Sequence, residues 1–182
     1  MPEIKSSLEI ALERAAALGG GGSEEIAREE GAKRGQVAAR KLLIGQLDPA
    51  AMAAEMGSLS GGGKAAARQA AGRILLEGLS QTPSRALAGL AALTEHDSGA
   101  PQAIKRLSKA LGAMAEAENQ LADNLAAEMK NDLARAGIGG SAVRPNPLAH
   151  PGFAERRDDA LAEGRKLYQA ALRDTAEVLN LA

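Results

Sequence analysis

The stretch 101–136, PQAIKRLSKALGAMAEAENQLADNLAAEMKNDLARA, decides the fold class of this chain. Its large apolar residues recur at intervals of three and four positions, the spacing that brings side chains to one side of a helix. The spacing is heptad-like over about three repeats, and the residues are Ile104, Leu107, Leu111, Met114, Leu121 and Leu125. The stretch therefore predicts one long amphipathic helix.

The composition extends this prediction to the whole chain. Alanine, the strongest helix former, is the commonest of the 182 residues. One phenylalanine, one tyrosine and no tryptophan are present, and valine is rare, which disfavours a sheet. We expect an all-α fold, a multi-helix bundle of about six or seven helices with a hinged N-terminal helical arm. Helices that pack through alanine should approach each other closely and bury little apolar area.

Glycine and proline divide the chain. Gly19–Gly22 and Ser23 predict a hinge at 19–23 between an amphipathic arm, 1–18, and a helical bundle domain, 24–182. Helices are predicted near 2–18, 23–43, 49–56, 63–79, 83–94, 101–136 and 153–179. The Pro-rich segment 137–152 predicts a long connector without helix. Gly31 and Gly35, one turn apart, indicate room for a close neighbouring helix.

Residues 57–68, GSLSGGGKAAAR, contain part of a phosphate-binding loop motif. The motif requires Gly, four residues and then Gly-Lys-Ser/Thr, all after a strand. Here Ser58 stands at the first glycine position, Ala65 stands at the hydroxyl position, and the preceding segment predicts a helix. A flexible turn before a helix is the preferred interpretation. Because a helix start attracts anions, the alternative is an anion site formed by Gly62, Gly63, Lys64 and Arg68.

Basic residues predominate between 33 and 90, and acidic residues predominate between 113 and 132, although the net charge is only −1. The basic residues are Lys33, Arg34, Arg40, Lys41, Lys64, Arg68, Arg73 and Arg85. Nucleic-acid binding through residues 33–85 is a further alternative, disfavoured because aromatic side chains that stack on bases are lacking. Packing of complementary helices, within or between chains, is the preferred interpretation.

Glu118 interrupts the apolar series of the stretch 101–136. One interpretation is a buried carboxylate that acts as an acid, a base or a ligand. The preferred interpretations are an edge position that reaches water, or a polar residue that fixes the register of a helical oligomer. The heptad series and the arm together predict a homo-oligomer. The residues assigned to oligomer or chain packing are Ile4, Leu8, Leu12, Leu107, Leu111, Met114, Glu118 and Leu121.

No pattern predicts a catalytic residue, a metal site or a cofactor. The chain has no cysteine, and neither His96 nor His150 belongs to the Glu-x-x-His motif of di-iron bundles. The amphipathic N-terminus lacks the features of a signal peptide, and no apolar run approaches the roughly 18 residues of a membrane span. We therefore expect a cytoplasmic protein that does not associate with membranes.

Residues 1–13, MPEIKSSLEIALE, resemble the start of a family of uncharacterised bacterial proteins, small and helical, without an assigned activity. The resemblance implies a bacterial intracellular protein, and it assigns no site residue. The leading functional hypothesis is a non-enzymatic interaction, scaffold or regulatory protein that self-associates through helix contacts and possesses a possible protein partner. An enzyme or a binding module for an anionic small molecule at 61–68 is the alternative.

Overall fold

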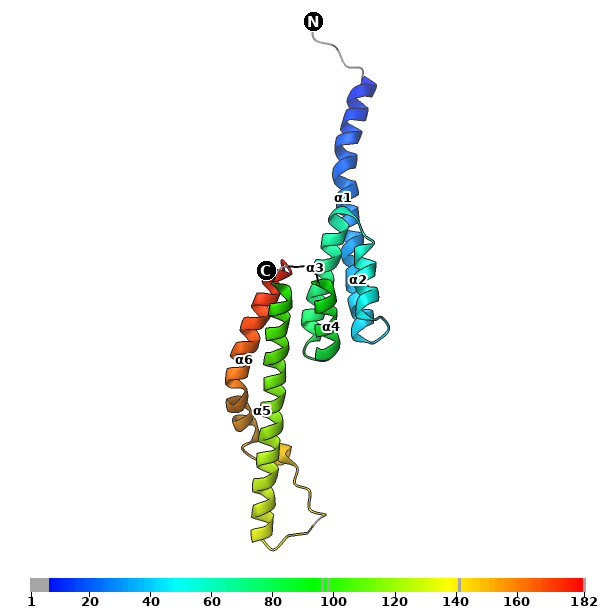
Figure 1. Ribbon diagram of the computed structural model, residues 1–182. Coiled ribbons are helices and arrows are strands. Elements are labelled where there is room, and N and C mark those ends of the chain that lie inside the picture. Colours follow the sequence, from blue (N-terminus) through cyan, green and yellow to red (C-terminus); the bar gives the residue numbers. More distant parts are fainter. Residues whose placement is uncertain (1–6, 96, 98, 141, 182) are drawn as a thin grey trace. The chain divides into compact units, whose positions relative to one another are not determined.

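The computed structural model describes the backbone of residues 7–95, 97, 99–140 and 142–181, and the side chains of these residues from Ser23 onward. This part of the chain contains six α-helices, one short 3-10 helix and no strand (Figure 1). The helices are α1 (Ser7–Leu43), α2 (Pro49–Gly57), α3 (Gly61–Gly78), α4 (Pro83–Leu93), α5 (Ala100–Arg135), η1 (Pro147–Ala149) and α6 (Phe153–Val178). The all-α prediction is confirmed.

Helix α1 is continuous through residues 19–23, where the sequence predicted a hinge. The predicted break is wrong. Each glycine costs a helix about 1 kcal/mol relative to alanine, but no proline removes a backbone donor there. Helical turns on both sides therefore continue the hydrogen-bond series through the glycines. Leu8 and Leu12 lie in this helix before the part with described side chains, and Ile4 lies outside the described residues.

The chain divides into two compact units. Unit 1 is Met1–Pro101 with Glu177–Ala182, and unit 2 is Gln102–Ala176. This organisation differs from the single bundle domain that the sequence predicted for 24–182. Periodicity shows which side of a helix is apolar, but it does not show which helix covers that side.

Helices α1 and α3 of unit 1 run side by side in the same direction (Figure 1). A Cβ atom on Gly31 would overlap the backbone of Gly63, and one on Gly35 would overlap the backbone of Ala67. A Cβ on Gly63 would lie 2.8 Å from the carbonyl oxygen of Ala27. The two backbones are therefore in direct contact, which the absence of a side chain at Gly31 and Gly35 permits. The close neighbour that Gly31 and Gly35 indicated is α3.

Helices α2 and α4 complete unit 1. The Asp48 carboxylate accepts a hydrogen bond from the Ala51 N–H at 2.8 Å, and Pro49 occupies the first turn of α2, as expected at a helix start. The core consists of buried aliphatic side chains from all four helices, among them Ala38, Leu42, Met52, Met56, Ala67, Ala71, Leu75, Ala86 and Leu90. Since alanine contributes little apolar area, this core depends on close helix contacts.

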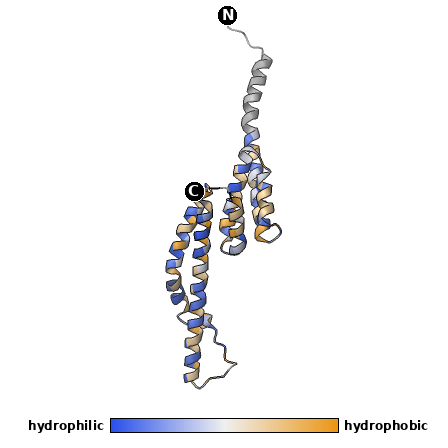
Figure 2. Cartoon of the chain, viewed as in Figure 1, coloured by the Kyte–Doolittle hydropathy of each residue, from blue (hydrophilic) through white to orange (hydrophobic). Residues whose placement is uncertain are grey.

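Unit 2 contains the antiparallel pair of α5 and α6. Figure 2 shows hydrophilic and hydrophobic residues interspersed along both helices. Leu125 and Leu161 are buried. Two ion pairs join the helices, Arg106 to Asp174 at 3.1 Å and Arg156 to Glu128 at 2.7 Å. The apolar side of α5 therefore has a partner within the same chain.

The connector between α5 and α6 contains the short helix η1, whereas the sequence predicted no helix over 137–152. Asn146 initiates η1, because its side-chain oxygen accepts a hydrogen bond from the Leu148 N–H at 3.1 Å. Pro147 then supplies a fixed backbone angle at the first position. The rest of the described connector has no regular structure, as its prolines and glycines predicted.

Candidate functional site

The start of α3 is occupied by packing contacts with α1. Gly61 has a positive φ of 55°, which begins the helix after Ser60. The side chain of Arg28 lies against Gly62, because a Cβ there would be 2.9 Å from the Arg28 Nε. Gly63 is buried against α1. Gly62 and Gly63, two residues of the hypothetical anion site, thus make room for α1. The glycine stretch is the start of a helix that packs closely against α1.

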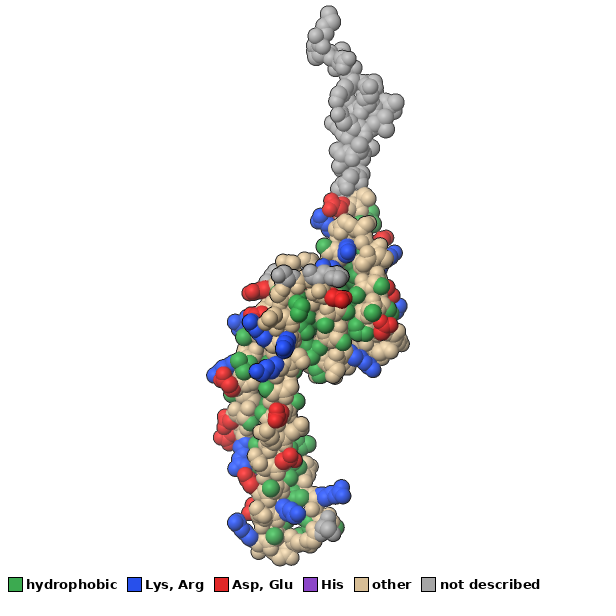
Figure 3. Space-filling model, in the orientation of Figure 1, with side chains coloured by type: hydrophobic (Ala, Val, Ile, Leu, Met, Phe, Trp, Pro, Cys, Tyr) green, Lys and Arg blue, Asp and Glu red, His purple; other side chains and the backbone are tan. Residues whose placement is uncertain are grey.

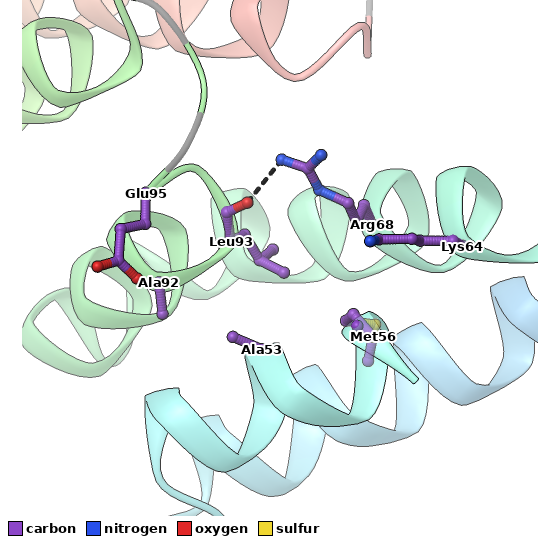
Figure 4. A pocket seen from close by; sticks show the side chains of 8 residues that line it. Ala53, Met56, Lys64, Arg68, Ala92, Leu93 and Glu95 are labelled. Atoms are coloured by element: carbon purple, nitrogen blue, oxygen red, sulfur yellow. Dashed lines mark hydrogen bonds between the residues drawn. The ribbon is translucent and has the colours of Figure 1, made fainter. Parts of the chain in front are cut away.

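Arg68, another residue of that hypothetical site, is held by acceptors inside unit 1. One of its terminal nitrogens donates to the Leu93 carbonyl oxygen at 2.6 Å and to an Asp97 carboxylate oxygen at 2.5 Å (Figure 4 shows the bond to Leu93). Leu93 is the last residue of α4, where carbonyl groups have no partner within the helix. The Arg68 guanidinium therefore provides a hydrogen-bond donor for the last carbonyl group of α4, and it forms an ion pair with Asp97, which follows that helix.

Two small cavities lie on either side of Arg68. The larger measures about 240 Å³ and is lined by Ala53, Met56, Gly57, Lys64, Arg68, Ala92, Leu93 and Glu95. Figure 4 shows Lys64 beside Arg68, with Glu95 on the opposite side. The smaller measures about 140 Å³. Both are below the roughly 300 Å³ at which pockets for small molecules begin.

The heptad series of α5 is buried or half-buried within the chain. Leu107 and Leu125 are buried, and Leu111, Met114 and Leu121 are half-buried. A Cβ on Gly164 of α6 would lie 2.7 Å from the Met114 Cγ, so the two helices approach closely at this point.

Glu118 forms an ion pair with Arg157 of α6. The Arg157 Nε donates to Glu118 Oε1 at 2.6 Å, and each side chain is about two-fifths exposed, at 41% and 43%. This hydrogen bond, together with the opposite charge, raises the pKa of Arg157 above its ordinary value. Glu118 thus lies at the polar edge of the apolar series, and its ion-pair partner belongs to the same chain. Figure 3 shows charged side chains of both signs interspersed along the α5 and α6 unit.

An exposed apolar side of α1 was not predicted from the sequence. Ile26, Val37 and Ile44 are 60%, 51% and 63% exposed. They are separated by 11 and 7 residues, close to whole numbers of helical turns, so they lie on one side of the helix. Ile44 follows the end of α1, and its N–H still bonds to the Arg40 carbonyl oxygen at 3.1 Å. Helical periodicity applied to 23–44 alone would have revealed this stripe.

The stripe lies on the side of α1 that faces away from α3. Val37 is two residues from Gly35, and two residues correspond to about 200° around a helix. Gly35 contacts α3, so the exposed stripe and the packed side are on opposite sides of α1. We call the stripe formed by Ile26, Val37 and Ile44 the outer side of α1.

Charges along the described part of α1 divide into two groups. Glu24, Glu25, Glu29 and Glu30 precede Lys33, Arg34, Arg40 and Lys41, and all are exposed. Arg28 pairs with Glu24 at 2.8 Å, and Lys33 pairs with Glu29 at 3.9 Å. Two more basic residues between 33 and 85 have partners in the same chain, since Arg85 donates to the Leu43 carbonyl oxygen at 2.9 Å and Arg68 bonds to Asp97.

Other kinds of site have little support in the described part of the chain. None of its helices has the length and apolar character that would span a membrane. Among the same residues, no three His, Asp or Glu side chains are grouped so that they could hold a metal ion. The Nδ1 atom of His150 accepts a hydrogen bond from the Gly152 N–H at 3.1 Å, and His96 lies outside the described residues.

Comparisons with protein-family models, with curated proteins and with solved structures found no match to this chain. The resemblance of residues 1–13 to an uncharacterised bacterial family therefore stays a prediction.

Proposed function

We propose that this protein is a non-enzymatic helical interaction protein, a scaffold or a regulator, that acts through helix contacts and self-associates in the cytoplasm. The observation that supports this proposal is the outer side of α1, on which three large aliphatic side chains are more than half exposed. Isolated exposed aliphatic residues are common on protein surfaces. Three in one helical register, on a helix already packed on its opposite side, instead favour a contact surface.

The alternatives have less support. An anionic ligand near 61–68 would have to compete with Asp97 for Arg68, and Gly63 is already packed against α1. Nucleic-acid binding through 33–85 would rely on a surface that also exposes glutamates at 29 and 30. We propose neither.

Size-exclusion chromatography with light scattering on the full chain tests the proposal. The expected result is a mass above that of one chain, which falls towards the monomer mass on dilution. Native mass spectrometry of the freshly purified protein gives the oligomer mass and detects any retained small molecule. A monomer over the whole concentration range would contradict self-association, and a stoichiometric bound anion would favour the ligand alternative.

A further inference from the structure

Helix α1 has the charge pattern of a helix that pairs with a second copy of itself in the opposite direction. The four glutamates from 24 to 30 precede the four basic residues from 33 to 41, and the outer side of α1 spans both groups. In a parallel pair, glutamates would face glutamates and basic residues would face basic residues. In an antiparallel pair, each acidic group faces a basic group, so charge complementarity selects this direction.

Resting on the proposed self-association, we propose that a second copy of this chain docks on the outer side of α1, with the two α1 helices antiparallel. The interface is symmetric, so every contact occurs twice. Ile26, Val37 and Ile44 of each copy, which are exposed within one chain, supply its apolar contacts. The exposed Lys33 lies on the same side of the helix, between Ile26 and Val37. Docking removes the three aliphatic side chains from water, which favours association.

One register places Ile26 opposite Ile44 of the second copy and pairs opposite charges on both flanks; in this register Val37 lies opposite Lys33 of the second copy. When Ile26 faces Ile44 of the second copy, Glu29 faces Arg40 of that copy and Glu30 faces its Lys41. On a helix of 3.6 residues per turn, Glu29 and Arg40 lie on one flank of the stripe, and Glu30 and Lys41 lie on the other flank. In an antiparallel two-fold pair each flank meets the same flank of the partner. Both flanks therefore pair opposite charges.

Disulfide cross-linking tests the direction, because the natural chain contains no cysteine. Two single variants are made, Glu29→Cys and Arg40→Cys, both at exposed positions. Mixed and oxidised, they should give a covalent dimer of one chain of each kind, and each variant oxidised alone should stay largely uncross-linked. Cross-linked homodimers of each variant alone, with no covalent heterodimer in the mixture, would show a parallel pair and would overturn the proposal.

A second measurement tests the surface. Ile26→Glu should raise the dimer dissociation constant by about tenfold or more, because it places a charge in the contact between Ile26 and Ile44, which occurs twice. Leu167→Glu is the matched control, since Leu167 is a helical aliphatic residue that is 56% exposed outside α1. It should leave the dissociation constant unchanged. Circular dichroism confirms that both variants remain helical.

The outcomes separate this inference from the proposed function. If the natural chain sediments as a monomer at all concentrations, both self-association and this interface are refuted. If it forms an oligomer that Ile26→Glu does not weaken, the chain self-associates through another surface and only this inference is refuted. A dimer that Ile26→Glu weakens and that cross-links only in the mixture supports both.

Discussion

Gly35→Ala should disrupt the contact between α1 and α3. The added Cβ would lie 2.8 Å from the carbonyl carbon of Ala67 and 2.9 Å from its Cα, where non-bonded carbon atoms normally stay about 3.5–4.0 Å apart. The obstructing atoms belong to the backbone of a helix, so no rotamer change moves them away. The two helices must instead separate, by on the order of 1 Å.

Two opposing changes in free energy determine the result. Replacing glycine by alanine inside a helix favours the helix by about 1 kcal/mol. Forcing a methyl group into a filled interface costs about 1–3 kcal/mol, and a gap of up to about 1 Å loses a quarter to a half of the dispersion energy of the contacts beside it. We expect a net loss of about 1–2 kcal/mol. For a unit of about 100 residues this lowers the Tm by about 4–8 °C per kcal/mol.

Thermal unfolding followed by circular dichroism, together with urea titration, measures the effect. Gly112→Ala is the matched control, because Gly112 lies inside α5 and an added Cβ there meets no atom within 4 Å. It should raise the stability by up to about 1 kcal/mol. If Gly35→Ala raises the Tm as Gly112→Ala does, the direct backbone contact is refuted.

Three further predictions concern the polar contacts and the core. Arg68→Met removes both hydrogen bonds at the end of α4 and should lower the free energy of unfolding in urea by about 1 kcal/mol, since the side chain is partly solvated; an unchanged midpoint would contradict those bonds. A double-mutant cycle of Glu118→Gln and Arg157→Gln should show a coupling that weakens as NaCl is raised to about 1 M, and strictly additive effects would argue against the pair. Leu125→Ala should lower the free energy of unfolding by about 2–5 kcal/mol, whereas Leu167→Ala should change it by less than about 0.5 kcal/mol. Equal decreases in the unfolding free energy measured by calorimetry would disprove the difference in burial.

Much of the fold could be predicted from local patterns. The spacing of apolar residues in 101–136 and the prolines at 49 and 83 located the helices of the structure to within a few residues. The continuous helix through Gly19–Gly22 could not be predicted in this way, because glycine propensity argues for a break and only the structure on both sides opposes it. The division into two units depends on which amphipathic helices meet, and periodicity contains no information about partners.

The candidate sites were harder to predict. Lys64 and Arg68 were correctly placed at the start of α3, but sequence spacing could not reveal that Asp97, 29 residues beyond Arg68, would hold its guanidinium. Glu118 was recognised as an exception in an apolar series, whereas its partner Arg157 lies 39 residues away on another helix. The outer side of α1 was not predicted, because the predicted helix 23–43 ends one residue before Ile44 and thus contains only two members of the stripe.

The backbone contact between α1 and α3 restricts the paths by which this sequence can evolve. A clash between two side chains is relieved by a smaller residue on the opposite helix, so such positions can change together. At Gly31 and Gly35 the obstructing atoms are main-chain atoms of Gly63 and Ala67, and every amino acid has those atoms. No substitution on α3 can compensate for a larger residue on α1. Distant relatives that keep this unit should therefore retain two glycines four residues apart and a second pair of small residues 32 positions later, a pattern by which they would be identified after overall similarity is lost.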